Sequence, residues 1–116
     1  MNILIIDDNE GILDAFQAML ESEGHKVTIS QNAKVIKNFS DGQYPDLIFL
    51  DILLSGEDGR KICKILKRQN GTKKIPVIIM SAAMDMEESA KEANADGFLK
   101  KPFEMNEVLD AIRQFA

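Results

Sequence analysis

Cysteine and histidine, the residues that form disulfides and many metal sites in small proteins, are scarce in this sequence. Its 116 residues include one cysteine, Cys63, and one histidine, His25. A single cysteine excludes an intramolecular disulfide, and a lone histidine has no companion ligand for a metal site built on nitrogen and sulfur. We expect Cys63 to be buried within a helix and His25 to be an exposed residue in a turn.

Long hydrophobic runs are also absent. No apolar segment approaches the roughly 20 residues of a membrane-spanning helix, and the N-terminus has no signal-peptide pattern. The 14 basic and 19 acidic residues give a net charge of −5, which disfavours non-specific binding to a nucleic-acid backbone. We therefore expect a soluble, cytoplasmic protein that binds neither membranes nor nucleic acid directly.

Five short apolar runs predict the strands of a parallel sheet. Most are unbroken by polar residues, which is typical of strands that helices cover on both faces. The run at 27–29 alternates instead, as an edge strand would. The five runs lie at 3–6, 27–29, 47–50, 77–80 and 97–99.

Helical patterns separate these runs. Asn9 and Asn32 are suited to cap the first two helices, and Asp85 followed by Glu88 resembles a capping box. Five strands alternating with five helices predict an α/β fold, a doubly wound parallel sheet with helices on both faces. We expect a single domain over residues 1–116, because no linker or repeat interrupts the pattern. The predicted helices lie at about 9–23, 32–39, 58–68, 85–94 and from 104 onward.

The predicted helix at 58–68 is amphipathic and strongly basic. Its outward residues are most simply a solvated face, with anion binding as the alternative interpretation. The basic residues are Arg60, Lys61, Lys64, Lys67 and Arg68.

Polar side chains follow four of the strands and would meet at the carboxyl edge of the sheet, where ligands bind in such folds. Any one aspartate there could simply cap a helix, but the joint occurrence is harder to explain in that way. Three carboxylates in close proximity repel one another, and a hard cation such as Mg²⁺ would relieve the repulsion. One carboxylate could also act as a nucleophile and form an aspartyl-phosphate. The side chains are those of Asp7, Asp8, Asp51, Ser81 and Lys101.

Over all 116 residues the chain closely resembles the response-regulator receiver domains of bacterial two-component signalling. The resemblance implies a flavodoxin-like fold with strand order 2-1-3-4-5. It also implies transfer of a phosphoryl group, dependent on Mg²⁺ or Mn²⁺, from a histidine kinase or histidine phosphotransfer protein to Asp51. Such a domain assists its own phosphorylation without being a conventional enzyme. The residues that carry the resemblance are Asp7-Asp8, Asp51, Gly59, Ser81-Ala82 and Lys101-Pro102-Phe103.

The resemblance also implies a role for each residue of the site. The metal ligands would be Asp8, Asp51 and the Leu53 carbonyl, with Asp7 acting largely through water. The phosphoryl group would be contacted by Lys101, Ser81 and the Ala82 backbone. Ser81 and Phe98 would act as the switch, and the Lys101–Pro102 peptide bond would be cis. The fourth helix, fifth strand and fifth helix would present the signal to an effector or form a homodimer.

This sequence departs from the common pattern of the family at several positions. Serine replaces the commoner threonine at Ser81, Phe98 lacks a phenolic hydroxyl, and Leu53-Leu54-Ser55 stands where a Met-Pro pair is frequent. In the family, the side chains at the positions of Leu53 and Ala83 flank the path of the water that hydrolyses the phosphoaspartate. Since neither can orient that water, we expect a long-lived phosphorylated state.

Two other functions compete with this interpretation. A small aspartate-nucleophile phosphatase of the haloacid-dehalogenase type would need a second carboxylate where Leu53 stands. A flavodoxin-type cofactor binder would need a Ser/Thr/Gly-rich loop where this chain has Asp7-Asp8-Asn9-Glu10. The chain could be a stand-alone regulator or an excised N-terminal receiver. Met1 directly precedes the first strand, which argues against a receiver from the end of a hybrid kinase.

Overall fold

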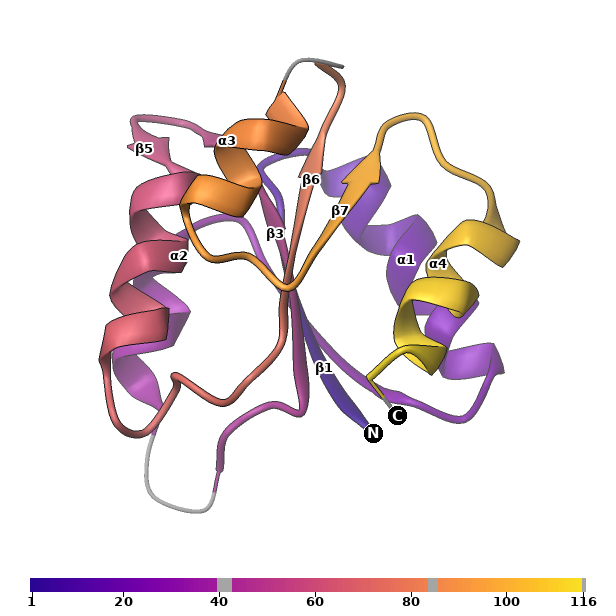
Figure 1. Cartoon of the computed structure of the whole chain (residues 1–116). Helices are drawn as coiled ribbons and strands as arrows, with labels where there is room; N and C mark the ends of the chain where they lie inside the picture. Colours follow the sequence, from indigo (N-terminus) through magenta and orange to yellow (C-terminus); the bar gives the residue numbers. More distant parts are fainter. Residues whose placement is uncertain (40–42, 84–85, 116) are drawn as a thin grey trace.

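Five parallel strands form the sheet at the centre of the molecule, and helices cover both of its faces (Figure 1). The structure is a computed structural model and describes residues 1–39, 43–83 and 86–115. The order of the strands confirms the predicted 2-1-3-4-5 arrangement of a flavodoxin-like sheet. In that order the strands are β2 (Lys26–Ser30), β1 (Asn2–Ile6), β3 (Leu47–Asp51), β6 (Val77–Ser81) and β7 (Gly97–Lys100).

Four α-helices pack on this sheet within the described residues. Helices α1 (Glu10–Ser22) and α4 (Met105–Arg113) cover one face, and α2 (Gly59–Arg68) and α3 (Glu87–Glu92) cover the other (Figure 1). None of the helices in these parts of the chain combines the length and hydrophobicity that a membrane span requires. An apolar core therefore lies on each face of the sheet, and the unbroken apolar runs of the strands contribute side chains to both cores.

Side-chain hydrogen bonds cap the first turns of α1 and α4. The Asn9 side chain accepts a hydrogen bond from the Ile12 amide at 3.0 Å, as its position in the sequence predicts. A capping box is present in α4, between Glu104 and Glu107. The one predicted at Asp85 lies outside the described residues, and α3 begins only at Glu87.

The prediction of five α-helices is wrong at the second one. The segment Ala33–Asn38 forms a 3₁₀ helix, η1, on the same side of the sheet as α2. Asn32 caps it as expected, but Phe39 is already extended, so only six residues are left for a helix. So short a segment gains few i→i+4 hydrogen bonds, and the β-branched pair Val35-Ile36 lowers the α-helical propensity further.

The core confirms the expected role of the lone cysteine. Cys63 is completely buried among the apolar side chains between α2 and the sheet. Burial raises the pKa of its thiol to about 11, so the thiol stays protonated and unreactive at neutral pH. On the other face, Phe16 packs against Phe49 and Phe103 with ring centroids 5.2 and 5.1 Å apart.

A small hairpin that the sequence did not predict connects β3 to α2. Its strands are β4 (Leu53–Leu54) and β5 (Glu57–Asp58), and Gly56 in the turn has a φ of +76°. Immediately after it, the Gly59 amide donates a hydrogen bond to the Ile52 carbonyl at 2.8 Å. The backbone of Gly59 is thus held directly against the end of β3.

We predict that Gly59→Ala destabilises the fold and displaces Asp51. A Cβ atom at position 59 would overlap the Asp51 carbonyl and lie 2.9 Å from the Ile52 Cα, and both are backbone atoms with little room to move. The expected loss in the free energy of unfolding is about 1–3 kcal/mol, measured by urea denaturation. Gly11→Ala is the control, because its Cβ would meet only the Asn9 side chain at 3.2 Å. Equal stabilities of the two variants would contradict the prediction.

Candidate functional site

Three carboxylates and one ammonium group meet at the carboxyl edge of the sheet. Lys101 Nζ lies 2.6 Å from an oxygen of Asp7 and 3.4 Å from an oxygen of Asp51. Carboxylate oxygens of Asp7, Asp8 and Asp51 all lie within 4.8 Å of one another. The structure thus brings together the four charged residues that the sequence placed at the strand ends.

The register of the sheet accounts for this proximity. Ile6 of β1 pairs with Leu50 of β3, so the residues that follow them, Asp7 and Asp51, are neighbours at the same level. Lys101 follows β7 on the far side of β6, and its amide donates to the Ser81 carbonyl at 2.8 Å. Its long side chain is what allows the ammonium group to reach back across β6 to both aspartates.

Burial makes the charge balance of this cluster unfavourable. Asp7 is 1% exposed and Asp51 is 7% exposed, whereas Asp8 is exposed to solvent. Burial raises the pKa of Asp51 above its usual value, and the negative charge of Asp7 adds to this effect. The ammonium group of Lys101 opposes the rise in pKa but does not cancel it. Among the described residues, one ammonium group thus pairs with two of the three carboxylates, and the third, Asp8, lies close by.

The donor set fits a divalent cation. All three side chains offer oxygen, the ligand type that hard cations select, and the exposed Asp8 gives an ion access from solvent. Both oxygens of Asp7 are already engaged, because Oδ1 accepts the Asn9 amide at 2.9 Å and Oδ2 accepts Lys101. Asp8 and Asp51 therefore have more ligand capacity left than Asp7.

The remaining predicted site residues lie around the cluster. Ser81 ends β6 and is buried, and its Oγ accepts the Ala83 amide at 3.1 Å. Leu53 projects into solvent and is 67% exposed. Phe98 is partly buried against the core on the face of the sheet that α2 and α3 cover. The Lys101–Pro102 bond is cis, which the family resemblance implied.

Ser55 is a residue of the site that the sequence analysis did not assign to it. Its hydroxyl, at the tip of the β4–β5 hairpin, donates a hydrogen bond to Asp8 Oδ2 at 3.0 Å. The sequence showed only that serine stands in a loop where a Met-Pro pair is frequent. A hydroxyl in the loop directly after Asp51 was the available signal, but the hairpin that aims it at Asp8 was not predictable from that signal.

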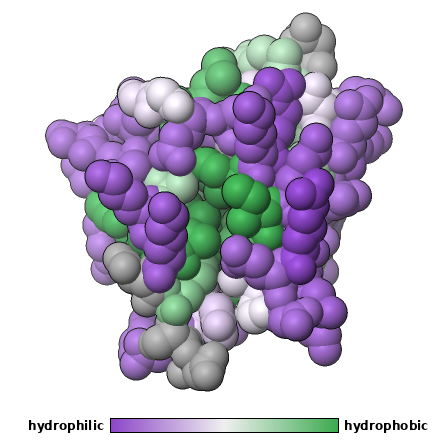
Figure 2. All heavy atoms as spheres, turned by 90° about the vertical axis from the view of Figure 1, so that its left-hand side faces the viewer, coloured by the Kyte–Doolittle hydropathy of each residue, from purple (hydrophilic) through white to green (hydrophobic). Residues whose placement is uncertain are grey.

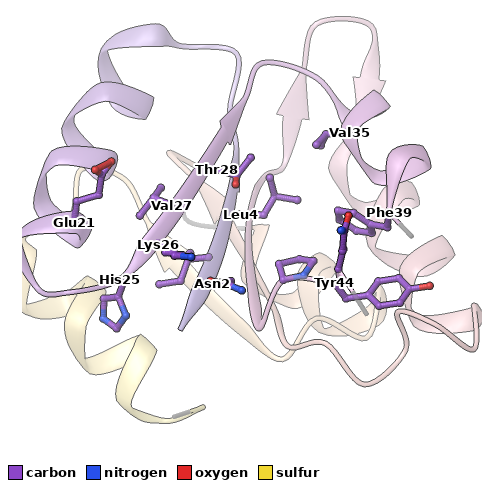
Figure 3. Close-up of a pocket in the computed structure, with 13 residues that line it drawn as sticks. Asn2, Leu4, Glu21, His25, Lys26, Val27, Thr28, Val35, Phe39 and Tyr44 are labelled. Carbon is purple, nitrogen blue, oxygen red and sulfur yellow. The ribbon is translucent and has the colours of Figure 1, made fainter. Parts of the chain in front are cut away.

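A cavity of about 710 Å³ lies away from this cluster, beside the edge strand (Figure 3). Its lining includes Lys26 of β2, Phe39 and Tyr44, and it contains none of the clustered aspartates. His25, expected to be exposed, is partly buried at this cavity, and its Nδ1 is 3.4 Å from the Met1 amino group. This hollow and the charged site are therefore different places.

A five-stranded sheet of this order, with an acidic cluster and a lysine at its carboxyl edge, defines a phosphorylation-dependent signalling domain. The chain belongs to the response regulator receiver domain family, whose model matches residues 3–113. Receiver domains take phosphoryl groups from histidine kinases and are often fused to effector domains. Nothing in these comparisons supports the alternative of a small phosphatase.

Similar proteins differ in how much of their length the chain matches. It is 34% identical over 113 residues to the DNA-binding dual master transcriptional regulator RpaA of Synechocystis, covering 96% of this chain and 47% of that protein. It is 33% identical to sporulation initiation phosphotransferase F of Bacillus subtilis, covering 97% and 91%. The chain thus spans about half of the length of RpaA but nearly all of the phosphotransferase.

A solved structure shares the fold closely. The receiver domain of the sensor histidine kinase PA1611 from Pseudomonas aeruginosa superposes with a TM-score of 0.86 at 25% identity, covering 98% of this chain and 95% of that one. That structure has a magnesium ion coordinated in its active-site cleft.

We predict that Asp51→Asn stabilises the metal-free protein at neutral pH. Because the pKa of Asp51 is raised in the folded state, the folded protein binds its proton more readily than the unfolded chain. The free energy of unfolding therefore falls as the pH rises from about 3.8, the pKa of Asp51 in the unfolded chain, through its raised pKa in the folded protein. The amide of the variant is neutral at every pH and avoids that loss. Urea denaturation with a chelator should show a gain at pH 7 that shrinks towards pH 4. The exposed Asp14→Asn is the control, and a less stable Asp51→Asn protein at pH 7 would refute the prediction.

Proposed function

We propose that the domain, over residues 1–116, is switched by phosphorylation of Asp51. The observation that carries this proposal is the 3.4 Å contact of Lys101 Nζ with Asp51 inside a cluster that fits a divalent cation. A carboxylate oxygen of Asp51 attacks the phosphorus of a phosphohistidine, and the P–N bond breaks as the P–O bond forms. The electron pair of the P–N bond stays on the imidazole of the kinase or phosphotransfer protein, which takes up one proton from solvent and leaves as neutral histidine. The domain assists this transfer to itself.

Magnesium, or manganese in its place, is the proposed cofactor. Asp8, Asp51 and the Leu53 carbonyl would hold it, and Asp7 would act through water because both of its oxygens already accept hydrogen bonds. When bound, the ion offsets the negative charge of the phosphoryl oxygens and of the carboxylates.

The protein groups around Asp51 are suited to hold the phosphoryl group. Lys101, already in contact with Asp51, offers a compact positive charge. The Ser81 hydroxyl and the Ala82 amide follow β6 at the same edge and would donate hydrogen bonds. To do so, the Ser81 hydroxyl would turn from its contact with the Ala83 amide.

That movement of Ser81 would carry the signal to the surface. Phe98 lies on β7, the neighbour of β6, and would turn inward into the space that Ser81 leaves. The population of the domain would then shift toward a second conformation of the surface formed by α3, β7 and α4. An effector or a second copy of the domain would bind that conformation.

A recess beside Lys101 suits the phosphoryl donor. A hollow of about 390 Å³ lies between α1 and the segment after β7, lined by Ile12, Ala15, Met19 and Phe103. Apolar side chains next to the phosphorylation site would let a helical phosphodonor dock with its histidine facing Asp51. We place this encounter in the cytoplasm, with no direct contact to nucleic acid or membrane by this domain.

The direct test is to phosphorylate the protein with acetyl phosphate and Mg²⁺ and to map the modified residue by mass spectrometry. We expect one phosphoryl group, on Asp51, which is absent after chelation and absent in Asp51→Asn. Asp14→Asn, on the solvent side of α1, is the matched control and should be modified normally. Modification that persists in Asp51→Asn or without metal would exclude the proposal.

We also predict a long-lived phosphoaspartate. A hydrolytic water must lie in line with the Asp51–phosphorus bond, held by a hydrogen-bonding group. The exposed Leu53 offers only apolar surface there, and Ala83 has no polar side-chain atom. Leu53→Asn and Ala83→Glu should each speed dephosphorylation, by about tenfold or more for the better of the two. Ile65→Asn, exposed on α2, is the control, and unchanged decay in both site variants would show that water positioning here does not set the lifetime.

A further inference from the structure

Positive charge is concentrated in one stretch of this acidic protein. Residues 59–74 contain seven basic residues and no acidic one. Because the whole chain carries −5 and this stretch carries +7, the rest of the chain carries −12. The basic residues are Arg60, Lys61, Lys64, Lys67, Arg68, Lys73 and Lys74.

The solvent side of α2 places a hydrophobic residue within this charge. Lys61, Lys64, Ile65 and Arg68 are all exposed or half-buried and follow one another at i, i+3, i+4 and i+7, so they form one continuous surface. Ile65 is 50% exposed, although the buried side of the helix is fully occupied by other residues. An exposed isoleucine thus lies among three cations.

The neighbouring η1 extends the same pattern. Lys34 and Lys37 are exposed, whereas Val35 and Ile36 are partly buried and pack on the core that α2 also covers. Figure 2 shows this side of the molecule, with apolar side chains in the middle and hydrophilic ones on both sides. We call the surface formed by Lys34, Lys37, Lys61, Lys64, Ile65 and Arg68 the basic face.

Within the part of the chain that the structure describes, no carboxylate neutralises the charges of the basic face. Arg60 is held by Asp58 at 2.8 Å, and Lys67 by Asp96 and the Ile75 carbonyl, so both serve the fold. The five cations of the basic face make no ion pair with any described residue. They are therefore free to meet charges from outside.

We propose that the basic face docks an acidic amphipathic segment of a partner protein. An apolar centre within a charged rim is the usual anatomy of a protein interface. A helix with a short apolar stripe between glutamates or aspartates would cover Ile65 and the edge of η1 and place carboxylates against the lysines. This surface lies on α2 and η1, apart from the phosphorylation site, so the unphosphorylated protein binds.

Extended polyanions fit this surface less well. A nucleic acid or an anionic membrane reaches far beyond the basic face and meets the rest of the chain, which carries −12. Neither offers a short apolar stripe to match Ile65 and η1. A short acidic segment meets only the basic face, because charges farther than about 8 Å are largely screened at physiological salt.

The test is fluorescence anisotropy with the unphosphorylated full chain and a panel of labelled helical peptides. In the panel, glutamates flank a leucine stripe of varied length. At least one peptide should bind, more weakly as NaCl rises. Lys64→Glu/Arg68→Glu should weaken the affinity for that peptide about tenfold or more, and Lys64→Gln/Arg68→Gln should weaken it less. Ile65→Ser should weaken the affinity several-fold.

Lys26→Glu/Arg113→Glu is the matched control, since it changes the net charge equally at exposed positions outside the basic face. It should leave the affinity within about twofold. Circular dichroism checks that each variant is folded. The proposal is overturned if no peptide binds, if the control weakens binding as much, or if a DNA duplex or phosphatidylserine vesicles bind the same face as tightly as the best peptide.

Discussion

The contact of one lysine with two buried aspartates is the interaction on which this structure depends. Lys101 reaches Asp7 at 2.6 Å and Asp51 at 3.4 Å, and both carboxylates are nearly inaccessible to water. Buried carboxylates are costly unless they are paired, and a single ammonium group is shared between two of them, with Asp8 close by. The site is therefore held together by the fold while it keeps a deficit of positive charge. That deficit is what suits it to a cation and to a phosphoryl group.

The scaffold around this contact explains why it persists. Asp51 ends a strand whose residues are all buried, and the chain that leaves it is held by the Gly59 amide on Ile52. Lys101 is anchored through its own amide on the Ser81 carbonyl. The backbone at Asp51 and at Lys101 is thus anchored by hydrogen bonds of the sheet edge, so a change in charge at Asp51 acts on side chains whose backbone is held in place.

The strands, their order and the charged cluster could be predicted because they follow from unbroken apolar runs and from the residues directly after them. The predictions that were wrong or missing concern short segments whose structure depends on tertiary contacts. Ala33–Asn38 carried a helical pattern, but the segment is short and contains a β-branched pair, which together disfavour an α-helix, and it forms a 3₁₀ helix. The hairpin that brings Ser55 to Asp8 depends on the pairing of the two-residue strands β4 and β5. Strands this short leave no periodic pattern in the sequence. The exposure of Ile65 likewise emerged only when the buried side of α2 was seen to be filled.

Calorimetric titration of the unphosphorylated protein with Mg²⁺ tests most directly whether the charge deficit at the sheet edge is a cation site. The account predicts one ion per chain, at least about tenfold weaker binding in Asp8→Ala, and tighter binding in Lys101→Met, because that variant removes the competing ammonium group. Absence of binding, or equal affinities in the wild type and Asp8→Ala, would contradict it.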